Sequence, residues 1–137
     1  MEFQKEDYIK YRAAKSKSTL LEVKVLLENQ FWNTAIRRMY YTCFYMVGAL
    51  LVKNNIKAQS HSGCIQQFGK HFVLNEMIDK QSARVNFELF EKRQKGDYND
   101  FFDFDMETAT NLYLPTTGFV EKIELLLATD NLAKAGS

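Results

Sequence analysis

The sequence predicts an all-α protein, an antiparallel helical bundle of about five helices. Apolar residues recur at steps of three and four along most of the chain, and no stretch keeps the strict alternation of a strand. Hydrophobic residues make up 46% of the 137 residues, which excludes a disordered chain. This length allows one sizeable core but not two. We therefore expect a single domain over residues 1–137, with its core at about 7–128.

Two long helices are predicted first, at about Asp7–Glu28 and Phe31–Val52. The break between them is only two residues long, so they must form an antiparallel hairpin. The second helix is apolar on nearly all sides, which is typical of a helix enclosed by others. Arg37 and Arg38 interrupt it near its start. A guanidinium must reach water or an anion, so this pair is a candidate binding group.

Two shorter helices are expected next. After a loop that begins at Ile56, Ser60 or Ser62 can cap a third helix that continues through Phe72. A fourth helix is predicted at about Ser82–Lys95, and Gly96 is expected to stop it because glycine favours helix C-termini.

The last helix is predicted to begin after Asp105, a good N-cap residue. Pro115 lies inside its apolar pattern and should kink or split the helix near Leu112, because proline lacks the backbone N–H. Residues 130–137 are expected to form a frayed tail.

Composition and charge exclude several classes of protein. The net charge is +1, so no general attraction to nucleic acid or membranes is expected. No apolar run is long enough to cross a bilayer, and the charged N-terminus does not resemble a signal peptide, so we expect a cytoplasmic protein. Residues 1–60 carry a net charge of +5 and residues 61–137 carry −4. This asymmetry fits either two ordinary solvated faces or a basic first hairpin that meets RNA or an acidic partner.

No metal or cofactor site is predicted. His61, Cys64 and His71 lack further ligands at the spacing of a zinc site. The acidic segment from Asp97 to Glu107 lacks the glycine and glutamate of a calcium loop at the required offsets. There is also no glycine-rich phosphate loop and no nucleophile elbow.

Arg93 stands out near the end of the fourth helix, followed by Asp97 and Tyr98. A guanidinium there is favoured by the helix dipole. It can form a bidentate pair with Asp97, or it can bind a phosphate. Both interpretations stay open at this point.

Four segments together resemble the HEPN family, the higher eukaryotes and prokaryotes nucleotide-binding domain, and specifically its small stand-alone prokaryotic members. The segments are RRMYYTCFY from Arg37, SHSG from Ser60, RQKGDY from Arg93 and FVEKI from Phe119. The resemblance covers about residues 7–128. It implies an up-and-down helical bundle that commonly forms homodimers.

The resemblance also implies a biochemical class. Active HEPN proteins are metal-independent RNases, often toxins paired with a small nucleotidyltransferase antitoxin. Their signature is an arginine followed, after four to six residues, by a histidine. Here Arg93 matches the arginine, but Tyr98 and Asn99 occupy the histidine window. A tyrosine with an ordinary pKa of about 10 is a poor base at neutral pH.

We therefore expect a HEPN-like domain that binds RNA or a nucleotide, forms half of a toxin–antitoxin-like or nucleotidyltransferase-paired module, and lacks the full nuclease signature. The binding residues implied are Arg93, Asp97, Tyr98, Arg37, Arg38, Tyr41 and His61. One alternative is an RNase in which His61 or Asp97 serves Arg93 as the acid–base group. The other is an interaction module without a site, whose aromatic segment 98–104 docks a partner helix.

Overall fold

The structure is a computed structural model that describes residues 2–98 and 103–129, without the side chains of residues 2, 3, 97 and 98. Its elements are α1 (Glu2–Glu28), α2 (Trp32–Lys53), α3 (His61–Phe68), the π-helical turn η1 (Gly69–Val73), α4 (Lys80–Tyr98) and α5 (Met106–Leu127). No strand occurs within these described ranges, which confirms the predicted all-α bundle. The predicted frayed tail, 130–137, lies outside them.

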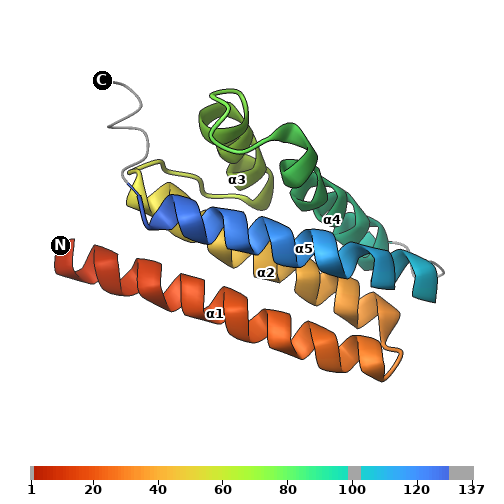
Figure 1. Cartoon of the computed structure of the whole chain (residues 1–137). Helices are drawn as coiled ribbons and strands as arrows, with labels where there is room; N and C mark the ends of the chain where they lie inside the picture. Colours follow the sequence, from red (N-terminus) through yellow and green to blue (C-terminus); the bar gives the residue numbers. More distant parts are fainter. Residues whose placement is uncertain (1, 99–102, 130–137) are drawn as a thin grey trace.

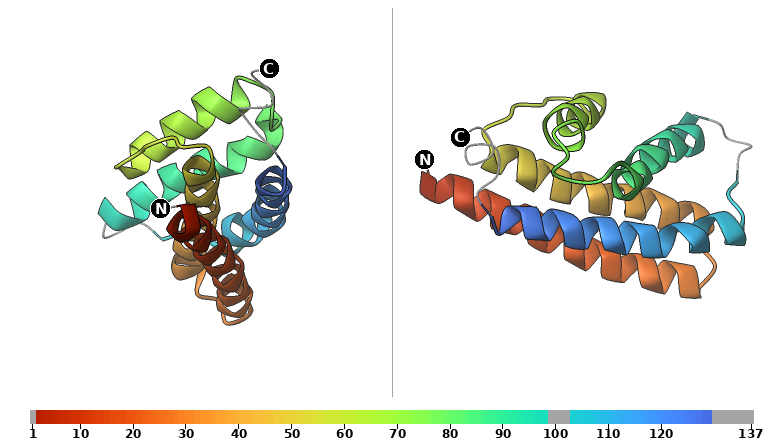
Figure 2. Two further views of the ribbon diagram at one scale, coloured as in Figure 1. Left: turned by 90° about the vertical axis from the view of Figure 1, so that its left-hand side faces the viewer. Right: turned by 45° about the horizontal axis from the view of Figure 1, so that its top comes forward.

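Three long helices lie side by side, and α3 and α4 cross over them (Figures 1 and 2). The helix α1 is antiparallel to α2, as predicted, whereas α5 runs in the same direction as α2. Contacts at both ends hold this parallel pair. At one end, the Lys53 ammonium donates to the backbone carbonyls of Leu127 and Thr129. At the other end, the Asn33 amide nitrogen donates to Asp103 at 2.8 Å and its amide oxygen accepts the Phe104 N–H at 2.7 Å.

The second helix is the centre of the core, as its apolar sequence predicted. It contacts α1, α3, α4 and α5. Its buried apolar residues come from more than one face, which is why four other helices can pack on it. They include Ile36, Met39, Tyr40, Cys43, Met46, Val47, Leu50 and Leu51.

Side-chain caps fix the starts of α3 and α5 where the sequence predicted them. The Ser60 hydroxyl accepts the Gly63 N–H at 2.9 Å. The Asp105 carboxylate accepts the Thr108 N–H at 2.8 Å, and its bonds to Thr108 lower the pKa of Asp105. The cap at Ser60 also places the next residue, His61, on the first turn of α3.

Two predicted helix breaks are wrong, the stop at Gly96 and the split at Pro115. Gly96 does not stop α4, which continues to Tyr98, since none of the glycines in the described part has the positive φ of a terminating glycine. Pro115 does not split α5, which is continuous over Met106–Leu127. The helix is anchored on both sides of the proline by buried side chains, among them Leu112 and Phe119, so packing outweighs the missing backbone hydrogen bond.

Replacing Pro115 by alanine should therefore stabilise the protein. The exposed proline lacks the N–H that would bond within α5, and an interior proline costs about 3 kcal/mol relative to alanine. We expect the free energy of unfolding to rise by about 1–3 kcal/mol in urea denaturation. Leu114→Ala is the neighbouring control, because Leu114 is also exposed, and should change stability by less than about 0.5 kcal/mol. A Pro115→Ala protein no more stable than wild type would contradict this account.

Candidate functional site

Tyr40 and His61 form the centre of the candidate site. Tyr40 comes from the middle of α2 and is only 1% exposed. Its hydroxyl lies 2.5 Å from Nδ1 of His61, the first residue of α3. A buried tyrosine hydroxyl needs a hydrogen-bond partner, and the imidazole supplies it. The hydrogen bond thereby fixes the orientation of the His61 ring.

Arg93 reaches the same tyrosine from α4. Its guanidinium carbon lies 5.2 Å from the centroid of the Tyr40 ring and 5.4 Å from that of Tyr41. These are cation–π distances. The His61 ring in turn lies edge-on to Tyr41, with centroids 6.1 Å apart. The fold therefore brings Arg93, His61 and Tyr41 together, although the sequence separates them widely.

The electrostatics of this group favour a neutral imidazole and a neutral phenol. Burial and the positive charge of Arg93 hold the pKa of His61 below its ordinary value of 6.5. Burial raises the pKa of Tyr40, and this outweighs the opposing effect of Arg93. At pH 7 the site thus presents a neutral imidazole beside a cationic guanidinium. Such a pair can bind an anion and accept a proton from a group held next to it.

A second arginine, Arg12 of α1, lies next to this centre and was missed in the sequence analysis. Phe44 joins the two. The Phe44 ring stacks on His61 with centroids 4.5 Å apart, and the Arg12 guanidinium carbon lies 5.0 Å from the same ring. Arg12 also donates to the Phe44 carbonyl at 3.2 Å. The sequence feature that could have pointed to Arg12 is Gly48, an isolated glycine in an apolar helix. Because glycine has no side chain, it leaves room for the Arg12 guanidinium.

The remaining predicted site residues are placed differently or are not described. Arg38 forms an ion pair with Glu22 of α1 at 2.8 Å, so its charge is engaged between the first two helices. Arg37 is exposed on α2. The side chains of Asp97 and Tyr98 lie outside the described residues.

Among the residues that the structure describes, no group of three or more histidine, cysteine, aspartate or glutamate side chains could hold a metal ion. His61 bonds to Tyr40, and His71 bonds to Gln67 at 3.1 Å within its own helical segment. Cys43 and Cys64 are buried free thiols, and burial raises the pKa of each. Over the same described residues, no helix has the length and apolar character that a membrane crossing requires.

Comparisons with known proteins place this chain in a family. The profile described as HEPN domain matches residues 9–126. A protein of Thermotoga maritima named "UPF0332 protein" is 32% identical over 124 residues, which cover 90% of this chain and 94% of that protein. Two proteins of Methanocaldococcus jannaschii, each named "Putative toxin", are 29% and 30% identical and cover 88% and 82% of this chain. The matches cover 82% and 83% of those two proteins. The chain belongs to the HEPN family.

Proposed function

We propose that this HEPN domain binds RNA or a nucleotide through a phosphate held at Arg93, with His61 beside it. The observation that carries the proposal is the meeting of Arg93 and His61 at one buried tyrosine, Tyr40. The domain would act in a toxin-like module. Two relatives carry the word toxin in their names, which supports this role.

The chemistry of the group suits a phosphodiester. The planar guanidinium of Arg93 offers several N–H donors that match phosphate oxygens. The neutral imidazole of His61 can hydrogen-bond a phosphate or ribose hydroxyl without adding charge. Tyr41 is only partly buried, so its ring offers a stacking surface for a base. Binding through these groups needs no metal ion.

A homodimer and a nucleotidyltransferase partner complete the proposal, and both rest on the family resemblance. The alternative prediction, an interaction module without a binding site, has weaker support. Most of its aromatic segment 98–104 lies outside the described residues. Phe104, which is described, packs partly buried against the core of its own chain, and its N–H bonds to Asn33.

Replacing Arg93 by alanine should weaken binding of a labelled single-stranded RNA by about 10- to 100-fold, because charge-assisted hydrogen bonds to the phosphate are lost. Fluorescence anisotropy at about 50 mM salt measures this, since phosphate contacts are strongest at low salt. Arg84→Ala is the matched control, because Arg84 is exposed on the same helix. It should bind nearly as tightly as wild type. Unchanged binding in Arg93→Ala, together with a large loss of thermal stability, would assign Arg93 a purely structural role.

A second candidate function is metal-independent RNA cleavage. The observation that favours it is that His61 approaches Arg93 from another helix and is neutral at pH 7. In this reaction His61 removes the proton from a ribose 2′-hydroxyl. The 2′-oxygen then attacks phosphorus, and the 5′-oxygen leaves and takes up a proton from water, to which His61 afterwards releases its own; the products are a 2′,3′-cyclic phosphate and a 5′-hydroxyl. Arg93 would stabilise the charge on the phosphate oxygens.

A further inference from the structure

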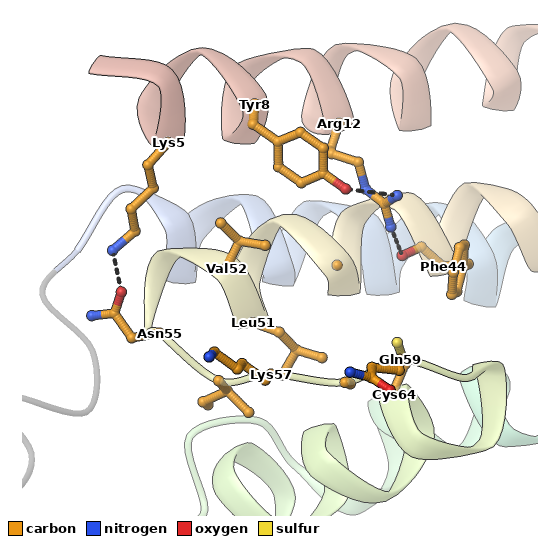
Figure 3. A pocket seen from close by; sticks show the side chains of 13 residues that line it. Lys5, Tyr8, Arg12, Phe44, Leu51, Val52, Asn55, Lys57, Gln59 and Cys64 are labelled. Atoms are coloured by element: carbon orange, nitrogen blue, oxygen red, sulfur yellow. Dashed lines mark hydrogen bonds between the residues drawn. The ribbon is translucent and has the colours of Figure 1, made fainter. Parts of the chain in front are cut away.

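A groove with a volume of about 480 Å³ lies beside the Arg93–His61 centre, the place where these two side chains meet Tyr40. Its walls are the first turns of α1, the end of α2, and the loop that leads into α3 (Figure 3). Lys5, Tyr8 and Arg12 project into it from α1. Phe44 and Cys64 form the end nearest to His61, because the Phe44 ring stacks on that imidazole. The groove and the centre thus share one wall.

The groove is positively charged. Its 13 lining residues include the cations Lys5, Arg12 and Lys57 and contain no aspartate or glutamate. Lys5 donates to the Asn55 amide oxygen at 2.7 Å, a neutral partner. Lys57 is exposed and makes no hydrogen bond or ion pair with other residues of the described part. Three cationic groups around one hollow favour an anionic ligand.

Arg12 is the least expected of these cations. It is partly buried, and its described hydrogen bonds go to neutral oxygens, the Phe44 carbonyl at 3.2 Å and the Tyr8 hydroxyl at 3.4 Å. Its Nε is buried and has no hydrogen-bond partner among the described residues. Cation–π contacts with Tyr8, Phe44 and Tyr45 support the charge without neutralising it. A partly desolvated guanidinium that meets no carboxylate within the described ranges is well placed to receive an external anion.

The walls of the groove also match the other parts of a nucleotide. Tyr8 is 46% exposed, and its ring offers a stacking surface for a base. The side-chain amides of Asn55 and Gln59 provide donors and acceptors for the edge of a base or a ribose. These groups surround the cations, so base and phosphate can be bound together.

We propose that this groove is a nucleotide subsite of the RNA-binding surface, with a phosphate of the strand between Arg12 and Lys57 and the neighbouring base on Tyr8. This inference rests on the proposed function, since the strand must also reach Arg93. Phe44 then lies between two phosphate positions, one at each arginine. The bound segment of RNA is single-stranded, because a base must leave its stack to reach Tyr8.

Two variants test the subsite without removing Arg12. Lys57→Glu reverses one exposed charge. It should weaken binding of a labelled 12-nucleotide oligoadenylate by about tenfold and reduce the slope of log K against log salt by about one. Gly48→Ala adds a methyl group 2.0 Å from the Arg12 guanidinium nitrogen Nη2, so the flexible arginine must move away. Alanine also favours the helix, so α2 should stay folded while RNA binding weakens several-fold.

Each variant has a matched control. Lys24→Glu makes the same change in charge at an exposed position of α1 outside the groove. Gly118→Ala adds a methyl group in α5 where nothing lies within 4 Å. Both should bind RNA within about twofold of wild type. Circular dichroism and thermal unfolding check that all four proteins are folded.

The outcomes separate this inference from the proposed function. If Lys57→Glu and Gly48→Ala bind RNA like wild type while Arg93→Ala binds weakly, the subsite is overturned and the proposed function stands. If Arg93→Ala also binds like wild type, the proposed function fails, and the subsite fails with it. Titration with AMP distinguishes the source of the nucleotide. If AMP binding depends on Lys57 and oligoadenylate binding does not, the groove binds a free mononucleotide and the RNA subsite is overturned.

Discussion

Replacing Phe119 by alanine should lower the free energy of unfolding by about 3–5 kcal/mol, the range typical of a buried phenylalanine. Phe119 lies in α5 and is 1% exposed. Its ring meets that of Phe68 edge to face, with centroids 5.6 Å apart, so it joins α5 to α3. The substitution leaves a cavity where these helices meet. Urea denaturation measures the loss, which is a large part of the 5–15 kcal/mol stability of an ordinary domain.

Phe87→Ala is the control for this prediction. Phe87 is 51% exposed on α4, so its removal takes away much less buried surface. We expect it to cost less than about 1 kcal/mol. Equal losses for the two variants would show that Phe119 does not occupy the packed position described above.

The helices and their starting points could be predicted from the sequence because local patterns determine them. The spacing of apolar residues in α2 reports how much of its surface is buried, and a helix apolar on nearly all sides has to be central. Ser60 and Asp105 could be recognised as N-caps because the cap bond reaches only three residues along the chain.

The helix breaks were mispredicted because tertiary packing outweighs local preference. Gly96 lowers helix propensity by about 1 kcal/mol and Pro115 by about 3 kcal/mol. Burial of flanking residues such as Leu89 and Phe119 stabilises their helices by comparable or larger amounts. The π-helical turn after α3, in which Phe72 is fully buried, was also not predicted.

The candidate site was only partly foreseen. Arg93 and His61 were each singled out, but their approach depends on how α3 and α4 cross α2, which no local pattern encodes. Arg12 was missed because it resembles the lysines around it. The polar and apolar residues of this helix are not clearly separated onto two faces. Its distinctive feature is a tertiary contact at Gly48. A pairing of that kind becomes visible only when both helices are in place.

Replacing His61 by glutamine should reduce Arg93-dependent RNA cleavage by about two to four orders of magnitude, the usual contribution of general acid–base catalysis. Glutamine can still hydrogen-bond the Tyr40 hydroxyl, so the buried phenol keeps a partner. It cannot take up the proton of a ribose hydroxyl. Cleavage of a single-stranded RNA in the presence of EDTA measures the effect, and His71→Gln is the control because His71 bonds to Gln67 instead.

The pH dependence identifies the group that titrates. Neutral imidazole is the active base, and burial and Arg93 lower its pKa below 6.5, so wild-type cleavage should be constant near pH 7 and fall as the pH drops below that pKa. The unfolded chain protonates His61 more readily than the folded one, so stability should also decrease as the pH falls through about 6.5. The glutamine variant should lose both effects.

A fall in cleavage at low pH that is unchanged in the glutamine variant would assign the base to another residue. An absence of any cleavage by the wild-type protein would end the RNase candidate and leave the centre as a phosphate-binding site, because binding needs the charge of Arg93 but no proton transfer at His61.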